Sequence, residues 1–208
     1  YYTDMAELAL LDNDTVADSE ETRSRDIFKT GGEGYATGLE LFVERRRGRL
    51  RGWLGYTLGW TRRQFSDIDG GRAFPPKYDR RHDISINASY QRGKWTSNIS
   101  FVYATGQAFT PATARYTLRT PATGLFTDRT LPARRNSARL LPYHRLDIGL
   151  RRNLVLLGSE AQLYLQIFNL YSRRNEWFVQ YNTDESTTDP QLIKMLPIVP
   201  TFGLDFAF

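Results

Sequence analysis

Residues 50–61, LRGWLGYTLGWT, alternate between large apolar side chains and small or polar ones. The apolar positions are Leu50, Leu54, Tyr56, Leu58 and Trp60, and the opposite positions are Arg51, Gly55, Thr57, Gly59 and Thr61. Successive side chains of a β-strand point to opposite faces of its sheet. A period of two therefore predicts a strand with one apolar and one polar face.

The same alternation recurs along the whole chain. It is present in 35–44, 83–90, 95–104, 145–151, 161–167 and 201–208. A weaker eighth strand is expected within residues 1–11. Three large side chains, Phe42, Trp53 and Phe168, fall on the polar face, which predicts a β-bulge or a packed interior site at each. The pattern predicts an all-β, antiparallel protein of about eight strands.

The connections between these segments alternate in length. Tight turns are expected at 46–49, 91–94 and 153–159. Long polar loops rich in Gly and Pro are expected at 12–34, 62–79, 105–142 and 182–191. Short turns at one rim and long loops at the other are typical of a transmembrane β-barrel, whereas such loops are uncommon in a compact soluble domain.

Composition and aromatic placement favour the membrane barrel over a soluble barrel or β-sandwich. The 208 residues include 28 aromatic side chains (12 Tyr, 12 Phe and 4 Trp) and no cysteine, which excludes disulfides and thiolate metal sites. Tyr90 and Trp95 flank one tight turn, while Trp60 and Tyr103 lie near long loops, as in two interfacial aromatic girdles. The sequence contains no run of about 18 apolar residues, so it predicts no membrane-spanning helix.

The densest polar cluster is the run from Tyr78 to Asp83, which contains His82 and is followed by Ser85. Strand parity places His82 and Asp83 on opposite faces, and no second cluster supplies a nucleophile or an oxyanion site. We therefore expect no enzyme activity, no cofactor and no metal site. The predicted role of this run, and of His144, is structural: charges that hold a long loop to the end of a strand.

A basic run, Arg45-Arg46-Arg47-Gly48-Arg49, contributes to the formal net charge of +5. It occupies a short turn rather than a wide patch, so contact with lipid phosphates is expected in preference to nucleic acid. Other charged residues are predicted on the polar faces and would face the lumen of a barrel. They are Glu40, Glu44, Arg51, Arg145, Asp147, Arg151 and Asp205. We expect them to pair between neighbouring strands, and none is assigned to a substrate.

Several segments resemble the late barrel strands of TonB-dependent outer-membrane receptors. They are GEGYATGLELFVE (32–44), GWLGYTLGWTRRQ (52–64), FPPKYDRRHDIS (74–85), FVYATG (101–106), PYHRLD (142–147), NLYSRRNEWF (169–178) and LPIVPTFGLDFAF (196–208). The resemblance implies a 22-stranded barrel with an N-terminal plug, energised by the TonB complex. It further implies active uptake of a siderophore, vitamin, oligosaccharide or peptide across a bacterial outer membrane.

The strand count limits how much of such a receptor is present. About 26 residues per strand would require about 570 residues for 22 strands. The chain is therefore expected to be the C-terminal part of a receptor barrel, without the plug and the earlier strands. The alternative is a self-contained eight-stranded outer-membrane barrel with a structural or adhesive role.

The last strand also resembles the signal by which outer-membrane barrels engage their assembly machinery. Its apolar residues are Phe202, Leu204, Phe206 and Phe208. The expected partners are therefore outer-membrane lipid, the barrel-assembly machinery, the TonB complex through the missing N-terminal part, and a nutrient ligand of unknown identity.

Overall fold

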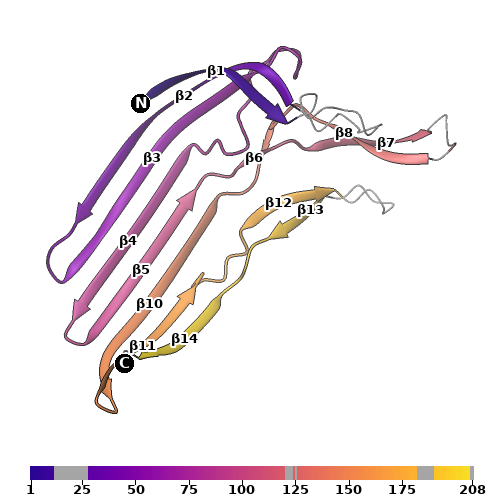
Figure 1. Cartoon of the computed structure of the whole chain (residues 1–208). Coiled ribbons are helices and arrows are strands. Elements are labelled where there is room, and N and C mark those ends of the chain that lie inside the picture. The colour runs from indigo at the N-terminus through magenta and orange to yellow at the C-terminus, as the bar shows by residue number, and fades with distance from the viewer. Residues whose placement is uncertain (12–27, 120–123, 125, 182–189, 207–208) are drawn as a thin grey trace. The chain divides into compact units, whose positions relative to one another are not determined.

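Eight strands form one antiparallel sheet, and six shorter strands form three separate two-stranded ribbons (Figure 1). The computed structural model describes residues 1–11, 28–119, 124, 126–181 and 190–206. The sheet strands are β1 (Tyr2–Leu11), β2 (Phe28–Arg45), β3 (Leu50–Gln64), β4 (His82–Arg92), β5 (Trp95–Ala104), β10 (Tyr143–Leu156), β11 (Ser159–Phe168) and β14 (Val199–Phe206). The ribbon strands are β6 (Ala108–Phe109), β7 (Ala112–Arg119), β8 (Phe126–Pro132), β9 (Ala138–Arg139), β12 (Glu176–Tyr181) and β13 (Pro190–Lys194).

The order of strands in the sheet is β1-β2-β3-β4-β5-β10-β11-β14, so each strand pairs with the next sheet strand along the chain. This confirms the predicted all-β, antiparallel architecture and all eight predicted strands. β1 and β14 are the two edges of the sheet. Within the described residues, no helix is long and apolar enough to cross a membrane.

Tight turns join the long strands at one end. Gly93 and Lys94 connect β4 to β5, and Leu157 and Gly158 connect β10 to β11. Gly93 (φ +57°) and both residues of the second turn (φ +53° and +83°) have left-handed backbone, which two-residue hairpin turns of the primed types require. The three tight turns were predicted correctly, although β10 extends to Leu156, well past the predicted end at residue 151.

The long connections contain more structure than the sequence suggests. The segment 105–142, predicted as a loop, holds the ribbons β6–β9 and β7–β8. The predicted loop 12–34 is also partly wrong because β2 begins at Phe28. The predicted loop 62–79 starts too early because β3 extends to Gln64. Residues 12–27 and 182–189 of the predicted loops lie outside the described residues.

The chain divides into two compact units. Unit 1 comprises 1–38, 59–79 and 107–139, and unit 2 comprises 39–58, 80–106 and 140–208. Unit 1 has a small aromatic core, in which Phe65 and Phe74 are 3% and 4% exposed and stack with ring centroids 6.2 Å apart. The Phe65 ring also fills the space beside Gly32, where any side chain would collide with it.

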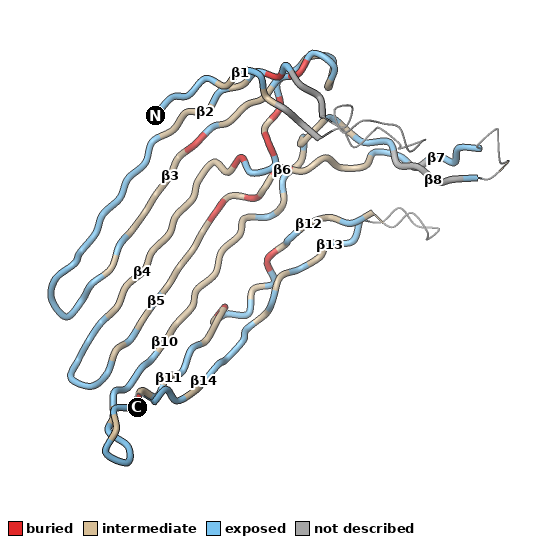
Figure 2. Tube along the Cα trace, in the orientation of Figure 1, coloured by how far each residue is buried: buried red, intermediate tan, exposed pale blue. Residues whose placement is uncertain are grey.

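Unit 2 is a single layer of paired strands with few buried side chains (Figure 2). Among its described apolar residues, only Ala104 and Ala161 are buried. The larger apolar residues of its strands are therefore not covered by a second layer within this part of the chain.

Candidate functional site

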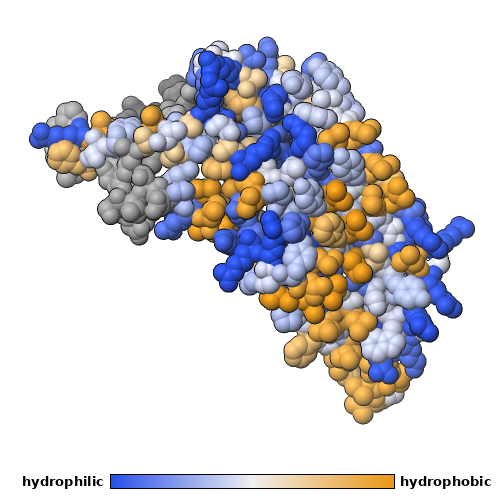
Figure 3. Space-filling model, turned by 180° about the vertical axis from the view of Figure 1, so that it is seen from behind, coloured by the Kyte–Doolittle hydropathy of each residue, from blue (hydrophilic) through white to orange (hydrophobic). Residues whose placement is uncertain are grey.

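One face of unit 2 is apolar. The register aligns Leu54, Ile86 and Phe101 on β3, β4 and β5, and it aligns Ile99, Ile148 and Ile167 on β5, β10 and β11. Many of the apolar residues in these and the neighbouring strands are strongly exposed. They include Leu39, Leu41, Val43, Leu50, Ile99, Leu163, Leu165, Phe202, Leu204 and Phe206. Figure 3 shows one side of the molecule, with apolar side chains gathered over the strands. A contiguous surface of this kind indicates contact with an apolar environment or partner.

The opposite face of unit 2 is polar, and its charged residues include Arg51, Arg145, Asp147, Arg151 and Asp205. Two of them face small polar residues of β5: Ser100 faces Asp147, and Thr96 faces Arg151, whereas Arg145 faces Val102. The described ion pairs that involve the seven charged residues predicted on this face are local, and pairing between neighbouring strands stays a prediction. Arg145 pairs with Asp147 on the same strand (Nη2–Oδ2 2.9 Å).

The other charged residues of this set lie nearer the short turns. Glu44 pairs with Arg46 at 2.6 Å, and Nε of Arg51 donates to the Gly48 carbonyl at 3.2 Å. Asp205 faces Gln162 of β11. Glu40 is exposed on β2.

The three large side chains on the polar face each contact a ring or a guanidinium group, but Phe42 and Trp53 remain 63% and 39% exposed. Phe42 stacks on Trp53 with ring centroids 6.1 Å apart. The Arg145 guanidinium lies over the Phe168 ring, 4.1 Å from its centroid. The pairing of β3 with β4 and of β10 with β11 is unbroken, which excludes a bulge at Trp53 in that pairing and along β10.

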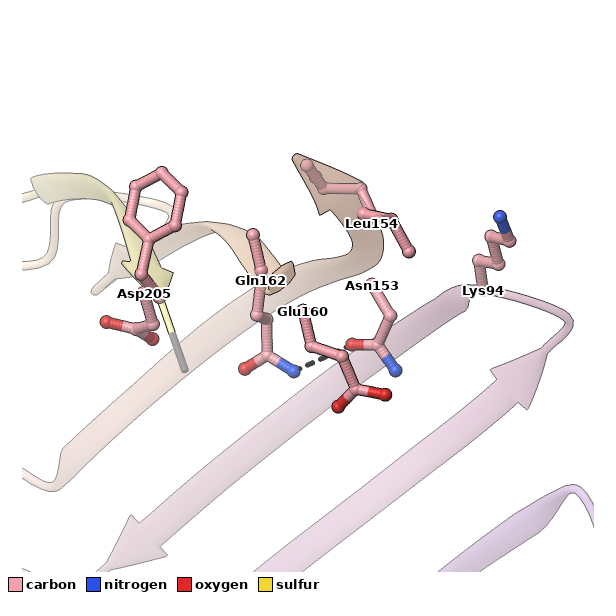
Figure 4. Close-up of a pocket in the computed structure, with 9 residues that line it drawn as sticks. Lys94, Asn153, Leu154, Glu160, Gln162 and Asp205 are labelled. Atoms are coloured by element: carbon pink, nitrogen blue, oxygen red, sulfur yellow. Dashed lines mark hydrogen bonds between the residues drawn. The ribbon is translucent and has the colours of Figure 1, made fainter. Parts of the chain in front are cut away.

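A hollow of about 440 Å³ opens where β10, β11 and β14 approach the short turns (Figure 4). Polar side chains from β10, β11, β14 and the β4–β5 turn line it: Lys94, Asn153, Glu160, Gln162 and Asp205. Gln162 donates to Asn153 at 2.8 Å, and Figure 4 shows Glu160 beside this pair. The hollow is open and mixed in charge, without a buried nucleophile or an oxyanion site.

Unit 1 contains a buried carboxylate, Asp79, whose side chain is 1% exposed. Its oxygens accept a hydrogen bond from the Thr61 backbone N–H at 2.9 Å and form an ion pair with Arg139. Arg139 also donates to the Asp79 carbonyl at 2.6 Å, and Arg62 lies 3.7 Å from the carboxylate. Asp79 thereby connects the end of β3 to the ribbon strand β9, which confirms the predicted structural role of the 78–83 run.

Neighbouring contacts in unit 1 hold the same connections. Asn136 donates through Nδ2 to the Pro75 carbonyl at 2.8 Å, and its backbone N–H donates to Thr110 at 2.9 Å. Arg63 donates to the Tyr78 hydroxyl at 2.7 Å. The segments 62–79 and 107–139 are therefore tied by side chains as well as by backbone pairing.

Unit 2 contains a second buried polar cluster, built on two asparagines after β11. Asn169 is 1% exposed and has left-handed backbone (φ +55°), which asparagine tolerates. Its Nδ2 donates to the carbonyls of Arg173 (2.8 Å) and Leu196 (2.9 Å), and its Oδ1 accepts from the Arg173 N–H (3.1 Å). Its own N–H donates to Asp147 at 2.8 Å.

Asn175, 4% exposed, attaches the same connection to the start of β10. It accepts from the His144 N–H at 3.1 Å and donates to the His144 carbonyl at 2.9 Å, so it pairs with both backbone groups of one residue. Arg173 donates to Asn175 at 3.1 Å and to the Pro142 carbonyl at 3.0 Å. The His144 ring contacts the Tyr171 hydroxyl at 2.7 Å. Partial burial raises the pKa of Tyr171, so the phenol stays neutral.

No catalytic arrangement appears around His82. Its Nδ1 lies 2.9 Å from the Tyr56 hydroxyl, while Asp83 lies near Arg80 at 3.9 Å. The described residues also contain no cluster of three or more acidic or histidine side chains that could hold a metal ion. The polar groups here support the fold.

The short-turn end of unit 2 is basic. Arg46–Arg49 form the β2–β3 turn, as predicted, while Arg92 ends β4 and Lys94 belongs to the β4–β5 turn. Arg152 lies over Trp95, with the guanidinium carbon 5.1 Å from the ring centroid. These side chains are exposed and form a rim of positive charge next to the apolar face.

A solved structure has the same arrangement of strands. The ferripyoverdine receptor of the outer membrane of Pseudomonas aeruginosa, crystallised with ferripyoverdine, aligns with 98% of this chain at a TM-score of 0.57 and 12% sequence identity. The chain has the fold of part of an outer-membrane receptor. It spans 23% of that receptor's length. No protein-family profile and no curated protein matches the sequence.

The receptor fold confirms the resemblance drawn from the strand segments at the level of architecture. The sequence did not predict the roles of Asn169, Arg173, Asn175 and Arg139. The run NLYSRRNEWF contains three of these residues and was quoted only as a strand signature. Their bonds go mainly to distant backbone groups, for which a single sequence carries no local signal.

Proposed function

We propose that this chain supplies eight neighbouring strands of a larger outer-membrane receptor barrel that takes up a nutrient. The observation that carries the proposal is a continuous antiparallel sheet with one exposed apolar face and two open edges, β1 and β14. The alignment with part of an outer-membrane receptor supports it.

The open edges favour a larger barrel over a closed barrel of eight strands. Unpaired backbone groups cost several kcal/mol each in hydrocarbon, so a membrane sheet has to be closed. In the alternative, self-contained barrel, β1 would pair with β14. The strand order instead leaves these two strands at opposite edges of the sheet.

The apolar face would contact lipid and the polar face would line the lumen. Glu40, Glu44, Arg51, Arg145, Asp147, Arg151 and Asp205 would then meet the plug or the water around it. The long connections would lie outside the cell and the short turns in the periplasm, as in barrels of this class. The proposed location is the bacterial outer membrane.

Energy for uptake would come from the TonB complex through parts of the receptor outside this chain. The nutrient belongs to the siderophore, vitamin, oligosaccharide or peptide class, and ferripyoverdine in the aligned receptor makes a siderophore the first to test. Neither a catalytic role nor a cofactor belongs to the proposal.

The terminal strand would serve as the signal for the assembly machinery. Phe202, Leu204 and Phe206 are 81%, 42% and 41% exposed on the apolar face, while Phe208 lies outside the described residues. Replacing Phe208 with Asp should lower outer-membrane levels and increase protease-sensitive periplasmic material. Unchanged membrane levels would remove this part of the proposal.

Cross-linking tests the larger barrel directly, because the sequence contains no cysteine of its own. Cysteine pairs between β1 (positions 2–5) and β14 (positions 202–205) should not cross-link in the membrane-inserted protein. The control pair Gln162→Cys with Asp205→Cys, which are register partners, should cross-link. Efficient bonds between β1 and β14 would establish the eight-stranded alternative.

Uptake tests the receptor role. Cells that require a ferric siderophore should lose growth when the receptor is deleted, and equally when TonB is deleted while receptor levels stay normal. Growth that depends on the receptor but not on TonB would contradict active transport.

A further inference from the structure

A hollow lies on the apolar face of unit 2, beside the basic rim. Its volume is about 530 Å³, and Tyr90, Arg92, Trp95, Ser97 and Leu150 line it. The hollow belongs to the face that would contact lipid, and it is separate from the polar hollow shown in Figure 4.

Strand register explains why these residues meet. Trp95 on β5 has Arg92 of β4 on one side and Arg152 of β10 on the other. One row further from the turn, Ser97 has Tyr90 on one side and Leu150 on the other. Ser97 is much smaller than its two neighbours, so the second row is indented between them.

The first row carries two positive charges next to apolar surface. Both guanidinium groups are exposed, and neither has a carboxylate partner among the described residues. Beyond the second row the face is apolar, with Ile99 between Ala88 and Ile148. From the short turn into the sheet, the face therefore presents first the two arginines and Trp95, then the indentation at Ser97, and then apolar surface.

We propose that this hollow binds one anionic phospholipid, such as a phosphatidylglycerol. Arg92 and Arg152 would bind the phosphate, since guanidinium groups match phosphate oxygens in charge and geometry. Trp95 would lie at the level of the headgroup, as interfacial aromatics do. The acyl chains would follow Ser97, Leu150 and Ile99 along the sheet.

Charge complementarity selects the occupant. A zwitterionic lipid brings its own cation close to the two arginines, whereas an anionic lipid offsets part of their positive charge and adds no cation. A soluble phosphate could use the arginines but not the apolar surface beyond them. The inference rests on the proposed membrane barrel, because only then does this face contact lipid.

The test uses the full receptor in phosphatidylcholine nanodiscs containing a small fraction of phosphatidylglycerol, with retained lipid identified by native mass spectrometry. The protein should retain phosphatidylglycerol in preference to phosphatidylcholine. The double variant Arg92→Gln/Arg152→Gln should lose about 30-fold of this preference. The control Arg72→Gln/Arg174→Gln makes the same charge change at exposed arginines of the long connections, away from the basic rim, and it should keep the preference.

A second variant distinguishes lipid binding in the hollow from a general attraction of anionic lipid to surface charge. Ser97→Leu adds volume to the hollow without changing charge, and it should also remove the preference. If Ser97→Leu binds like the parent, or Arg72→Gln/Arg174→Gln loses as much preference as the double variant, the site is refuted. If free glycerol phosphate displaces phosphatidylglycerol at equal concentration, the hollow is a site for soluble phosphate, and the proposal of a bound lipid is wrong.

Insertion is measured independently by protease protection and by the heat-dependent shift in electrophoretic mobility. A receptor that inserts but shows no phosphatidylglycerol preference refutes the lipid site and leaves the proposed function standing. A chain that fails to insert in any bilayer refutes the proposed function itself.

Discussion

The Tyr164 side chain of β11 covers Gly203 of β14, its register partner. A methyl group at Gly203 would collide with the Tyr164 hydroxyl and lie 2.9 Å from ring atom Cε1. An aromatic ring over a cross-strand glycine shields backbone that would otherwise be exposed, and it helps to fix the register. This contact attaches the edge strand β14 to the rest of the sheet.

Replacing Gly203 with Ala should destabilise the inserted protein by about 1–3 kcal/mol, because the ring must move from its position. The measurement is the denaturant midpoint of the heat-modifiable, folded band. Gly149→Ala is the matched control, since Gly149 lies on the same polar face and its nearest neighbouring atom would be 3.7 Å from the added carbon. An equal loss of stability in the two variants would show that the Tyr164 ring does not need the space beside Gly203.

Asp79→Ala should loosen the connections of unit 1. The substitution removes the acceptor of the Thr61 N–H and the partner of Arg139, and a lost bond to a charged group costs about 1.5–3 kcal/mol. Limited proteolysis should cut within 62–79 or 107–139 faster than in the parent. Asp83→Ala, whose side chain is 41% exposed and 3.9 Å from Arg80, should change little. Identical cleavage of the two variants would contradict the role of Asp79.

Asn175→Ala should release the connection between β11 and β14 from the start of β10. It leaves both backbone groups of His144 without their side-chain partner, at about 1–3 kcal/mol for each buried group. Hydrogen exchange of the His144 amide should accelerate. Asn153→Ala removes one exposed bond, to Gln162, and should leave the His144 amide unchanged. Slow exchange at His144 in the Asn175 variant would mean that the asparagine is dispensable.

The period-two pattern predicted the long strands because one face of each had to be apolar along its whole length. The ribbon β7–β8 escaped prediction although ATARYTLR at Ala112–Arg119 has the same period of two. Its partner FTDRTLP at Phe126–Pro132 lacks that period, and the whole segment was expected to be a loop. Boundaries were also underestimated where a charged residue interrupts the alternation, as Arg152 does before the last residues of β10, Asn153–Leu156.

The polar clusters were predictable only in part. Asp79 lies in a conspicuous run of charges, so a structural role could be expected for it. Its partner Arg139 is 60 residues away, and Asn169 binds the Leu196 carbonyl 27 residues away. Such contacts depend on which strand ends the sheet brings together, and residue types alone do not specify them.

Arginine substitutions should distinguish the two faces. Ile148→Arg, in a row with Ile99 and Ile167, should cost about 2–4 kcal/mol because it places a charge near mid-membrane on the lipid side. Leu165→Arg and Phe101→Arg should behave alike. Gln166→Arg and Asn98→Arg, on the polar face, should cost far less. Equal penalties on both faces, measured by denaturant unfolding in lipid, would indicate a soluble core.

The last prediction concerns orientation. Leu157, 95% exposed in the β10–β11 turn, and Phe126, 72% exposed at the start of β8, belong to connections at opposite ends of the strands. If the short turns face the periplasm, an impermeant maleimide should label Phe126→Cys on intact cells, and label Leu157→Cys only after the outer membrane is permeabilised. Leu157 already has left-handed backbone as a non-glycine residue, so cysteine there adds no new strain. Labelling of Leu157→Cys but not Phe126→Cys on intact cells would reverse the proposed orientation, and it would place the basic rim and its lipid site in the outer leaflet.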